Sequence, residues 1–154
     1  MLAEYISLKI FADFGENPQE IGNKLIQLIP FDIGEEKIPL NRNMVYGFNR
    51  EKIVIFEIRL IKKKHIRAFL EHFKSKLDDD LKSQLLKTLN ERLDDECNFY
   101  IRLSKLDLIY QDRYRLTTDG KCLHITINIA IYPKKRENAL QEIKNYLQSE
   151  TPII

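Results

Sequence analysis

The stretch NFYIRLSK, residues 98–105, alternates apolar and polar side chains along its length. Successive side chains of a β-strand point to opposite faces, so this alternation predicts a strand with one buried face. The side chains predicted to face a core are Phe99, Ile101 and Leu103. Those predicted to face the other way are Tyr100, Arg102 and Ser104, with Lys105 just beyond the strand.

Strand patterns of the same kind recur in other parts of the chain. They are found in residues 2–12, in the hairpin arms 36–46 and 51–61, and in residues 122–132. The last segment has an apolar residue at every second position from Leu123 to Ile131. The hairpin arms are joined around GFNR, residues 47–50, where Gly and Asn tolerate positive φ angles.

Apolar residues at helical spacing separate these strands. Helices are expected from Asn17 to Pro30, over 65–93 in two parts, as a short turn at 106–110, and over 137–147. Asn17 is expected to cap the first helix, and Pro30 is expected to end it. The run Asp78–Asp80 divides the second region and is interpreted as a helix cap, because capping and the helix dipole favour Asp at that place.

The chain has 154 residues, a length typical of one domain, so residues 1–154 are predicted to form a single domain. Hydrophobic residues make up 44% and charged residues 31%, which is typical of a globular protein. Together with the strand and helix patterns, this predicts an α+β fold in which helices cover one face of an antiparallel or mixed sheet. The net charge of +2 excludes a histone-like binder, so any nucleic-acid affinity has to come from local clusters.

The sequence contains no apolar run approaching the ~20 residues of a membrane span, and its first residues lack the pattern of a signal peptide. We therefore expect a cytoplasmic protein with no membrane partner. Cys97 and Cys122 are too few and too far apart for a zinc site, and an intracellular protein keeps such residues as thiols. Thermophilic archaea do form intracellular disulfides, so the redox state of the two cysteines stays open.

No catalytic motif is present, because the chain lacks a P-loop, a dinucleotide fingerprint, a metal-protease helix and a nucleophile elbow. The histidines His65, His72 and His124 are separated from the cysteines and from one another. This is typical of surface or hydrogen-bonded histidines. We predict no catalytic residue, no metal site and no cofactor.

The polar face of the strand predicted at residues 98–105 combines an aromatic ring with cations. A base can stack on Tyr100, while Arg102 and Lys105 can neutralise phosphates, as single-stranded or looped RNA requires. Arg113 and Arg115 follow in an irregular segment and extend this cationic set. An ordinary sheet surface is the alternative interpretation, because Tyr and Arg are common there.

The segment RLDDECNFYIRLSK, residues 92–105, resembles the signature of small archaeal RNA-binding proteins described as predicted exosome subunits. In that family an acidic turn precedes Asn-Leu-Tyr-Leu-Arg-Leu-Asp-Lys-Gln. The residues that match this signature are Asn98, Tyr100, Arg102 and Lys105. The resemblance implies a fold like that of the ribosomal protein that binds 5S ribosomal RNA. It also implies binding of structured or single-stranded RNA, and exosome subunits as protein partners. The cations themselves predict that this binding is independent of sequence, because they contact phosphates.

Two departures from the family pattern bear on this expectation. Ser104 stands where the family has Asp, and Leu106 stands where it has Gln. The turn YGFNR, residues 46–50, keeps Gly47 and Asn49 but lacks the histidine and proline of the family. The alternative is therefore a divergent paralogue that has kept the fold and lost RNA binding.

Two further functions are weighed against RNA binding. In the first, the chain is a structural or protein-interaction module, with a second copy of itself in a homodimer as one candidate partner. Such a surface concentrates apolar anchors at its centre, whereas an RNA-binding face gathers Arg and Lys. In the second, the protein is a metal-dependent nuclease, which requires Asp94, Asp95 and Asp107 to converge.

Overall fold

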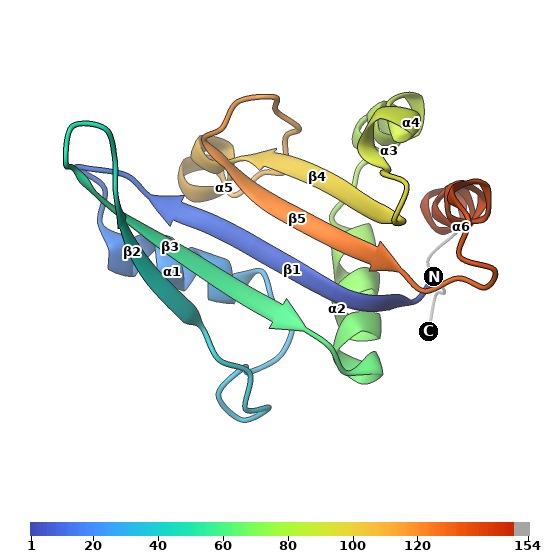
Figure 1. Ribbon diagram of the computed structural model, residues 1–154, viewed down its shortest axis with the longest axis horizontal. Coiled ribbons are helices and arrows are strands. Elements are labelled where there is room, and N and C mark those ends of the chain that lie inside the picture. Colours follow the sequence, from blue (N-terminus) through green and yellow to red (C-terminus); the bar gives the residue numbers. More distant parts are fainter. Residues whose placement is uncertain (150–154) are drawn as a thin grey trace. The chain divides into compact units, whose positions relative to one another are not determined.

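A computed structural model of the protein describes residues 1–149 (Figure 1). Its strands are β1 (Ala3–Ala12), β2 (Asn41–Tyr46), β3 (Lys52–Leu60), β4 (Asn98–Ser104) and β5 (Cys122–Ile129). Its helices are α1 (Pro18–Gln27), α2 (Lys63–Ser75), α3 (Asp79–Lys87), α4 (Leu89–Arg92), α5 (Lys105–Gln111) and α6 (Arg136–Gln148). The predicted α+β class is confirmed. None of the helices among these residues is long and apolar enough to cross a membrane.

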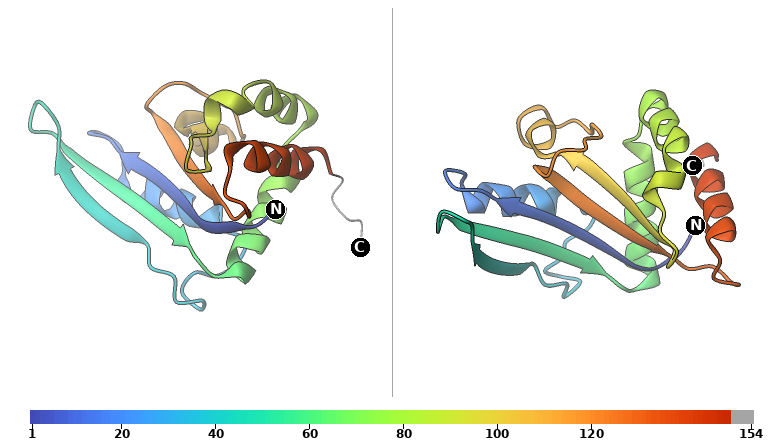
Figure 2. Two further views of the ribbon diagram at one scale, coloured as in Figure 1. Left: turned by 45° about the vertical axis from the view of Figure 1, so that its right-hand side comes forward. Right: turned by 45° about the horizontal axis from the view of Figure 1, so that its top comes forward.

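The strands form one open antiparallel sheet in the order β2-β3-β1-β5-β4. The pairing of β2 with β3 sets Asn41 opposite Glu57 and Tyr46 opposite Lys52. All views show β2 beside β3 and at the edge of the sheet (Figure 2). The predicted antiparallel sheet is therefore confirmed. The likeness to the 5S-RNA-binding ribosomal protein stays a prediction.

The chain divides into two compact units, and each unit is built from several separate segments of the chain. Of the described residues, unit 1 comprises 1–6, 61–101 and 126–149, and unit 2 comprises 7–60 and 102–125. Three strands of the sheet, β1, β4 and β5, continue from one unit into the other. The prediction of a single domain over residues 1–154 stays a prediction.

In unit 2, α1 packs against one face of β3. The ring of Phe56 approaches Gly22 so closely that a Cβ atom on Gly22 would lie 3.1 Å from it. Phe56 is buried, and the side chains two positions away on either side, Val54 and Ile58, are buried with it. Asn17 caps α1 as predicted, because its side chain accepts a hydrogen bond of 3.0 Å from the backbone N of Gln19. The opposite face of β3 is left more open.

In unit 1, helices α2, α3 and α6 carry the apolar core. The rings of Phe69 and Phe73 stack with their centroids 5.7 Å apart. The hydroxyl of Tyr146 donates a hydrogen bond of 2.5 Å to the backbone oxygen of Leu70, which joins α6 to α2. Asp78 caps α3 and accepts from the backbone N of Leu81 at 2.7 Å, so the capping interpretation is confirmed.

The strand predicted at residues 98–105 is confirmed in its facing pattern. Phe99, Ile101 and Leu103 are each 1% exposed, whereas Tyr100 and Arg102 lie on the more exposed side of β4.

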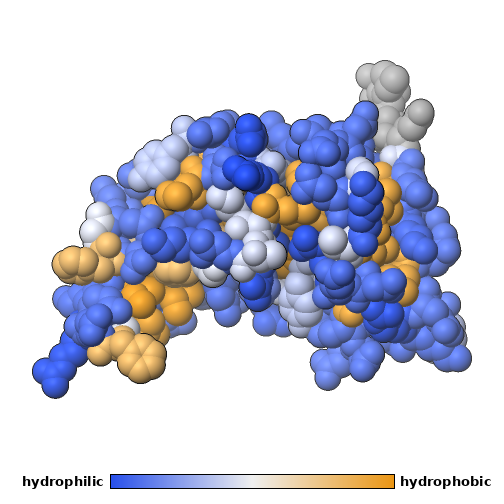
Figure 3. Space-filling view, turned by 90° about the horizontal axis from the view of Figure 1, so that it is seen from above, coloured by the Kyte–Doolittle hydropathy of each residue, from blue (hydrophilic) through white to orange (hydrophobic). Residues whose placement is uncertain are grey.

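Figure 3 shows one face of the molecule, on which hydrophilic side chains predominate and hydrophobic side chains appear in separate patches.

Two details of the predicted hairpin are wrong. Its first arm begins at Asn41 and not at residue 36, because the backbone N of Ile38 donates to the oxygen of Ile33 and closes a turn there. At the tip, the positive φ angle falls on Arg50, at 61°, and not on Gly47 or Asn49. The bond from the Arg50 backbone N to the Gly47 oxygen fixes this conformation.

Candidate nucleic-acid interface

Two predicted arginines of unit 2 are brought together by a short antiparallel bridge. Leu103 of β4 lies opposite Leu116. The backbone N of Ser104 donates to the oxygen of Arg115 at 2.7 Å, and the backbone N of Thr117 donates to the oxygen of Arg102 at 3.0 Å. In this register Arg115 lies opposite Ser104, and Arg102 lies two positions before Ser104 on β4. Opposite residues share a face, as do alternate residues of one strand, so Arg102 and Arg115 emerge on the same face as diagonal neighbours. Both are exposed, and we call them the arginine pair.

Arg113 precedes the arginine pair in the same segment and is also exposed. Its backbone N donates a hydrogen bond of 3.1 Å to the oxygen of Asp107, which anchors it to the first turn of α5. Between Arg113 and Arg115, Tyr114 is half-buried, and burial, with the nearby Asp112, raises the pKa of its phenol to about 12. Tyr114 is therefore neutral and less exposed than the two cations that flank it.

A hollow of about 400 Å³ opens on the same unit. Its apolar lining includes Phe11 of β1, Val45 of β2, and Ile53 and Ile55 of β3. Its polar lining includes Lys9 of β1, Arg102 of β4 and His124 of β5. Arg102 thus belongs both to the arginine pair and to the lining of this hollow.

The electrostatics of the hollow keep His124 neutral. Burial lowers the pKa of His124, and the nearby cations Arg102 and Lys9 lower it further. Lys9 in turn lies 3.7 Å from Oε2 of Glu57, which also accepts a hydrogen bond of 2.8 Å from Ser7. The lining therefore combines apolar side chains, a neutral imidazole and positive charge.

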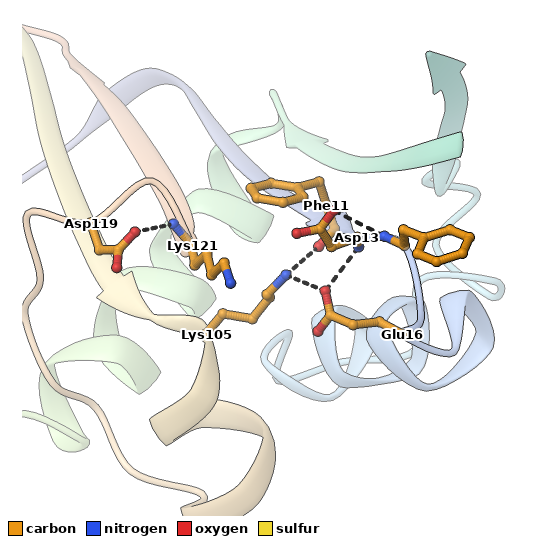
Figure 4. Close-up of polar contacts among 7 residues, drawn as sticks. Phe11, Asp13, Glu16, Lys105, Asp119 and Lys121 are labelled. Carbon is orange, nitrogen blue, oxygen red and sulfur yellow. Dashed lines mark hydrogen bonds and ion pairs between the residues drawn. The ribbon is translucent and has the colours of Figure 1, made fainter. Parts of the chain in front are cut away.

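Lys105, which the sequence places among the phosphate contacts, has its ammonium inside unit 2 and is 1% exposed. It donates to Oε1 of Glu16 at 2.6 Å and to the backbone oxygen of Phe11 at 3.0 Å, as Figure 4 shows. The same ammonium lies 4.2 Å from the centroid of the Phe11 ring. Lys105 therefore fixes the end of β1 and the ring that lines the hollow.

In unit 1, Asn98 and Tyr100 join a polar network around Asp94. The carboxylate accepts hydrogen bonds from the backbone N of Asn98 at 2.9 Å and from the hydroxyl of Tyr100 at 2.8 Å. Burial by itself raises the pKa of Asp94, but these bonds, with those from the Asn98 side chain and the Glu96 backbone, outweigh it and lower the pKa. The same bond to Asp94, followed by burial, raises the pKa of Tyr100.

The network extends to residues that the sequence did not single out as a site. The side chain of Asn128 donates to Oδ1 of Asn98 at 2.7 Å, and its own Oδ1 accepts from Lys134 at 3.0 Å. Asn98 and Asn128 are 8% and 7% exposed, so the network is largely buried. One signal was present in the sequence, because Asn128 is an amide between two isoleucines of a strand.

The predicted site residues therefore fall into two groups. Arg102, Lys105, Arg113 and Arg115 lie in unit 2, while Asn98 and Tyr100 lie in the network of unit 1. Over residues 1–149, no three His, Cys, Asp or Glu side chains form a group that could hold a metal ion. This includes the three carboxylates of the nuclease hypothesis, of which Asp94 is engaged by Asn98 and Tyr100.

Comparison with known proteins assigns the chain to a family. The family model described as RNA binding matches residues 5–129, and the chain belongs to this family. It is 22% identical to the RNA-binding protein PAB1135 of Pyrococcus abyssi over 148 residues, which cover 96% of each chain.

Solved structures show the same fold. The protein AF2318 from Archaeglobus fulgidus matches with a TM-score of 0.80 and 21% identity, covering 94% of this chain and 99% of its own. Mth689, a DUF54 protein from Methanothermobacter thermautotrophicus, matches with a TM-score of 0.77 and 22% identity, and the match covers 96% of this chain and 100% of Mth689. The resemblance to an archaeal RNA-binding family that the sequence indicates is thus confirmed.

Proposed function

We propose that this protein binds RNA through the exposed guanidinium groups of Arg102, Arg113 and Arg115. The observation that carries the proposal is the antiparallel bridge, which brings Arg102 and Arg115 out on one face of unit 2. Membership of the RNA-binding family supports RNA as the ligand. Guanidinium groups suit this role because their planar donors match two phosphate oxygens at once.

Local charge has to supply the affinity, because the whole chain has a net charge of only +2. Contacts to phosphates give an affinity that is independent of sequence and weakens steeply with salt. Lys105 supports this surface from inside through its contacts with Phe11 and Glu16. Tyr100 is proposed as a separate contact in unit 1 through its half-buried ring, with Asn98 and Asp94 holding its position.

The experiment is a titration of fluorescein-labelled single-stranded and hairpin RNA with the purified protein at low and moderate salt. The double variant Arg102→Ala with Arg115→Ala is expected to weaken binding to both RNAs. It is also expected to reduce the slope of log K against log salt by about 1.4, which corresponds to two phosphate contacts on a single strand.

The matched control removes two other exposed cations, Arg67→Ala on α2 and Lys87→Ala on α3. This control has the same net charge as the double variant but leaves the arginine pair intact. If both variants weaken binding equally, the site is not at the arginine pair. If the wild-type protein binds neither RNA at low salt, the proposed function is wrong.

The resemblance in residues 92–105 also supports a non-catalytic role in RNA processing, with exosome subunits as partners. Two measurements test this part separately. The length of the RNA is expected to stay unchanged after incubation with the protein and Mg²⁺. Purified archaeal exosome is expected to retain the protein on a column, and failure to retain it removes the exosome from the proposal.

A second candidate function is pairing with another copy of the chain along β2. Every residue of this edge strand is exposed, and apolar side chains gather there and in the following turn: Met44 at 55%, Tyr46 at 65% and Phe48 at 107%. An exposed edge of this composition is a template for strand pairing. Sedimentation is expected to give a dimer that Met44→Lys returns to a monomer, and a wild-type monomer at all concentrations excludes this function.

A further inference from the structure

The hollow of unit 2 places apolar side chains directly beside positive charge. Its volume of about 400 Å³ lies within the range of sites that enclose small molecules, ~300–1,000 Å³. Phe11, Ile53 and Ile55 supply an apolar lining, and Lys9 and Arg102 supply the cations. A nucleotide has the complementary structure, with a flat, weakly polar base attached to a charged phosphate.

The Phe11 ring is held in place for contact with a flat ligand. The Lys105 ammonium lies 4.2 Å from the ring centroid, and it also donates to the backbone oxygen of Phe11. Because Lys105 is 1% exposed, the side of the ring that it contacts is the buried side. Phe11 itself is only partly buried and lines the hollow. A ring held in this way is suited to stacking against a base.

His124 adds hydrogen-bonding groups to the same lining. Its side chain comes from β5, and the charged groups that act on it are Arg102 of β4 and Lys9 of β1. In its neutral form, an imidazole has one N–H donor and one nitrogen acceptor. The imidazole therefore adds a polar, uncharged side chain to a lining that is otherwise apolar or cationic.

We propose that the hollow receives one unpaired base of an RNA strand, which stacks on Phe11 while Lys9 and Arg102 contact the adjacent phosphates. This inference rests on the proposed RNA-binding function and specifies its ligand as unpaired RNA. A base inside a duplex is stacked and paired, and it cannot enter the hollow without being extruded. Single strands, loops and bulges are therefore the ligands that fit.

The test compares three labelled RNAs of equal length: an unpaired strand, the same ribose-phosphate strand without bases, and a perfect duplex. The wild-type protein is expected to bind the unpaired strand about tenfold more tightly than the strand without bases, the effect of one stacked base. Phe11→Leu removes the ring without changing charge and is expected to lose most of this preference. Phe11→Tyr restores a ring and is expected to retain it.

The matched control is Phe14→Leu, because Phe14 lies three residues further along, is 79% exposed and does not line the hollow. It is expected to keep the full preference, and urea unfolding verifies that each variant is folded. If the wild-type protein binds all three RNAs equally, or if folded Phe11→Leu keeps the preference, the inference is wrong. The arginine-pair proposal then still stands if Arg102→Ala with Arg115→Ala weakens binding. Absence of all RNA binding overturns both.

Discussion

The Nζ atom of Lys105 lies 2.6 Å from Oε1 of Glu16, a residue 89 positions earlier in the chain. The lysine side chain is 1% exposed and the glutamate side chain 22% exposed, so this is a largely buried ion pair. It ties the start of α5 to the turn that follows β1. Removal of one member of such a pair leaves the other charge poorly solvated.

We therefore expect Lys105→Met to lower the free energy of unfolding by roughly 2–4 kcal/mol, near the lower end for buried pairs because Glu16 is partly exposed. Urea denaturation measures the change. Lys121→Met is the matched control, since Lys121 is exposed and its hydrogen bonds with Asp119 (Figure 4) and with Lys105 are made by its backbone atoms, which the substitution keeps. Equal stability of the two variants would contradict the structural role given to Lys105.

The carboxylate of Asp94 is expected to stabilise unit 1 in a pH-dependent way. Its folded-state pKa is lowered from the ordinary value of 3.8, so its contribution is present above that value and is lost as the pH falls through the folded pKa. Asp94→Asn is expected to lower the free energy of unfolding by roughly 1–3 kcal/mol at neutral pH. The difference between the variant and the wild type is expected to become smaller in acid, and urea denaturation measures it. Asp95→Asn, a change at the exposed neighbour, is expected to be nearly neutral at every pH.

The lowered pKa of His124 predicts a second pH dependence of stability, in a higher pH range than that of Asp94. Its pKa is lowered in the folded protein from the ordinary value of 6.5, so the unfolded chain binds the proton first. The contribution of His124 is complete above 6.5 and declines as the pH falls below it. His72 also has a lowered pKa and adds its own share. In His124→Gln, the free energy of unfolding is expected to fall less steeply with decreasing pH than in the wild type. Urea denaturation at several pH values measures this slope, and an identical slope in both proteins would exclude the effect.

The cap of α3 gives a local prediction. Asp78 accepts a hydrogen bond of 2.7 Å from the backbone N of Leu81, so Asp78→Ala is expected to lower stability by about 1 kcal/mol. Asp78→Ser retains an accepting oxygen and is expected to restore most of the loss. Thermal unfolding separates the two variants, and equal melting temperatures would show that the side-chain bond contributes little.

The sequence predicted the features that depend on neighbours in the chain. The alternation around Ile101 identified the buried face of β4, and the positions of Asn17 and Asp78 identified two helix starts, because strand facing and helix capping are set within a few residues. The exposed arginines Arg102 and Arg115 were also named from the sequence. That they share one face beside the Leu103–Leu116 bridge required the structure.

The burial of Lys105 could not be read from the sequence, because it depends on Glu16 and Phe11 on distant elements. Lysine is rarely buried, and the pattern of residues 98–105 placed it among the outward cations. The pairing of Asn98 with Asn128 depends on a partner 30 positions away in the same manner. The site was thus predicted by residue type and only partly by arrangement.

The passage of the backbone between the two units has a consequence for how this protein can be divided. The chain leaves one unit for the other after residues 6, 60, 101 and 125, so neither unit is a continuous segment. A single cut between residues 7 and 125, whether made by a protease or by gene truncation, leaves parts of both units on each side. Neither unit can therefore be transferred to another protein as one continuous segment. A segment that carries both the arginine pair and the Asp94 network contains parts of both units.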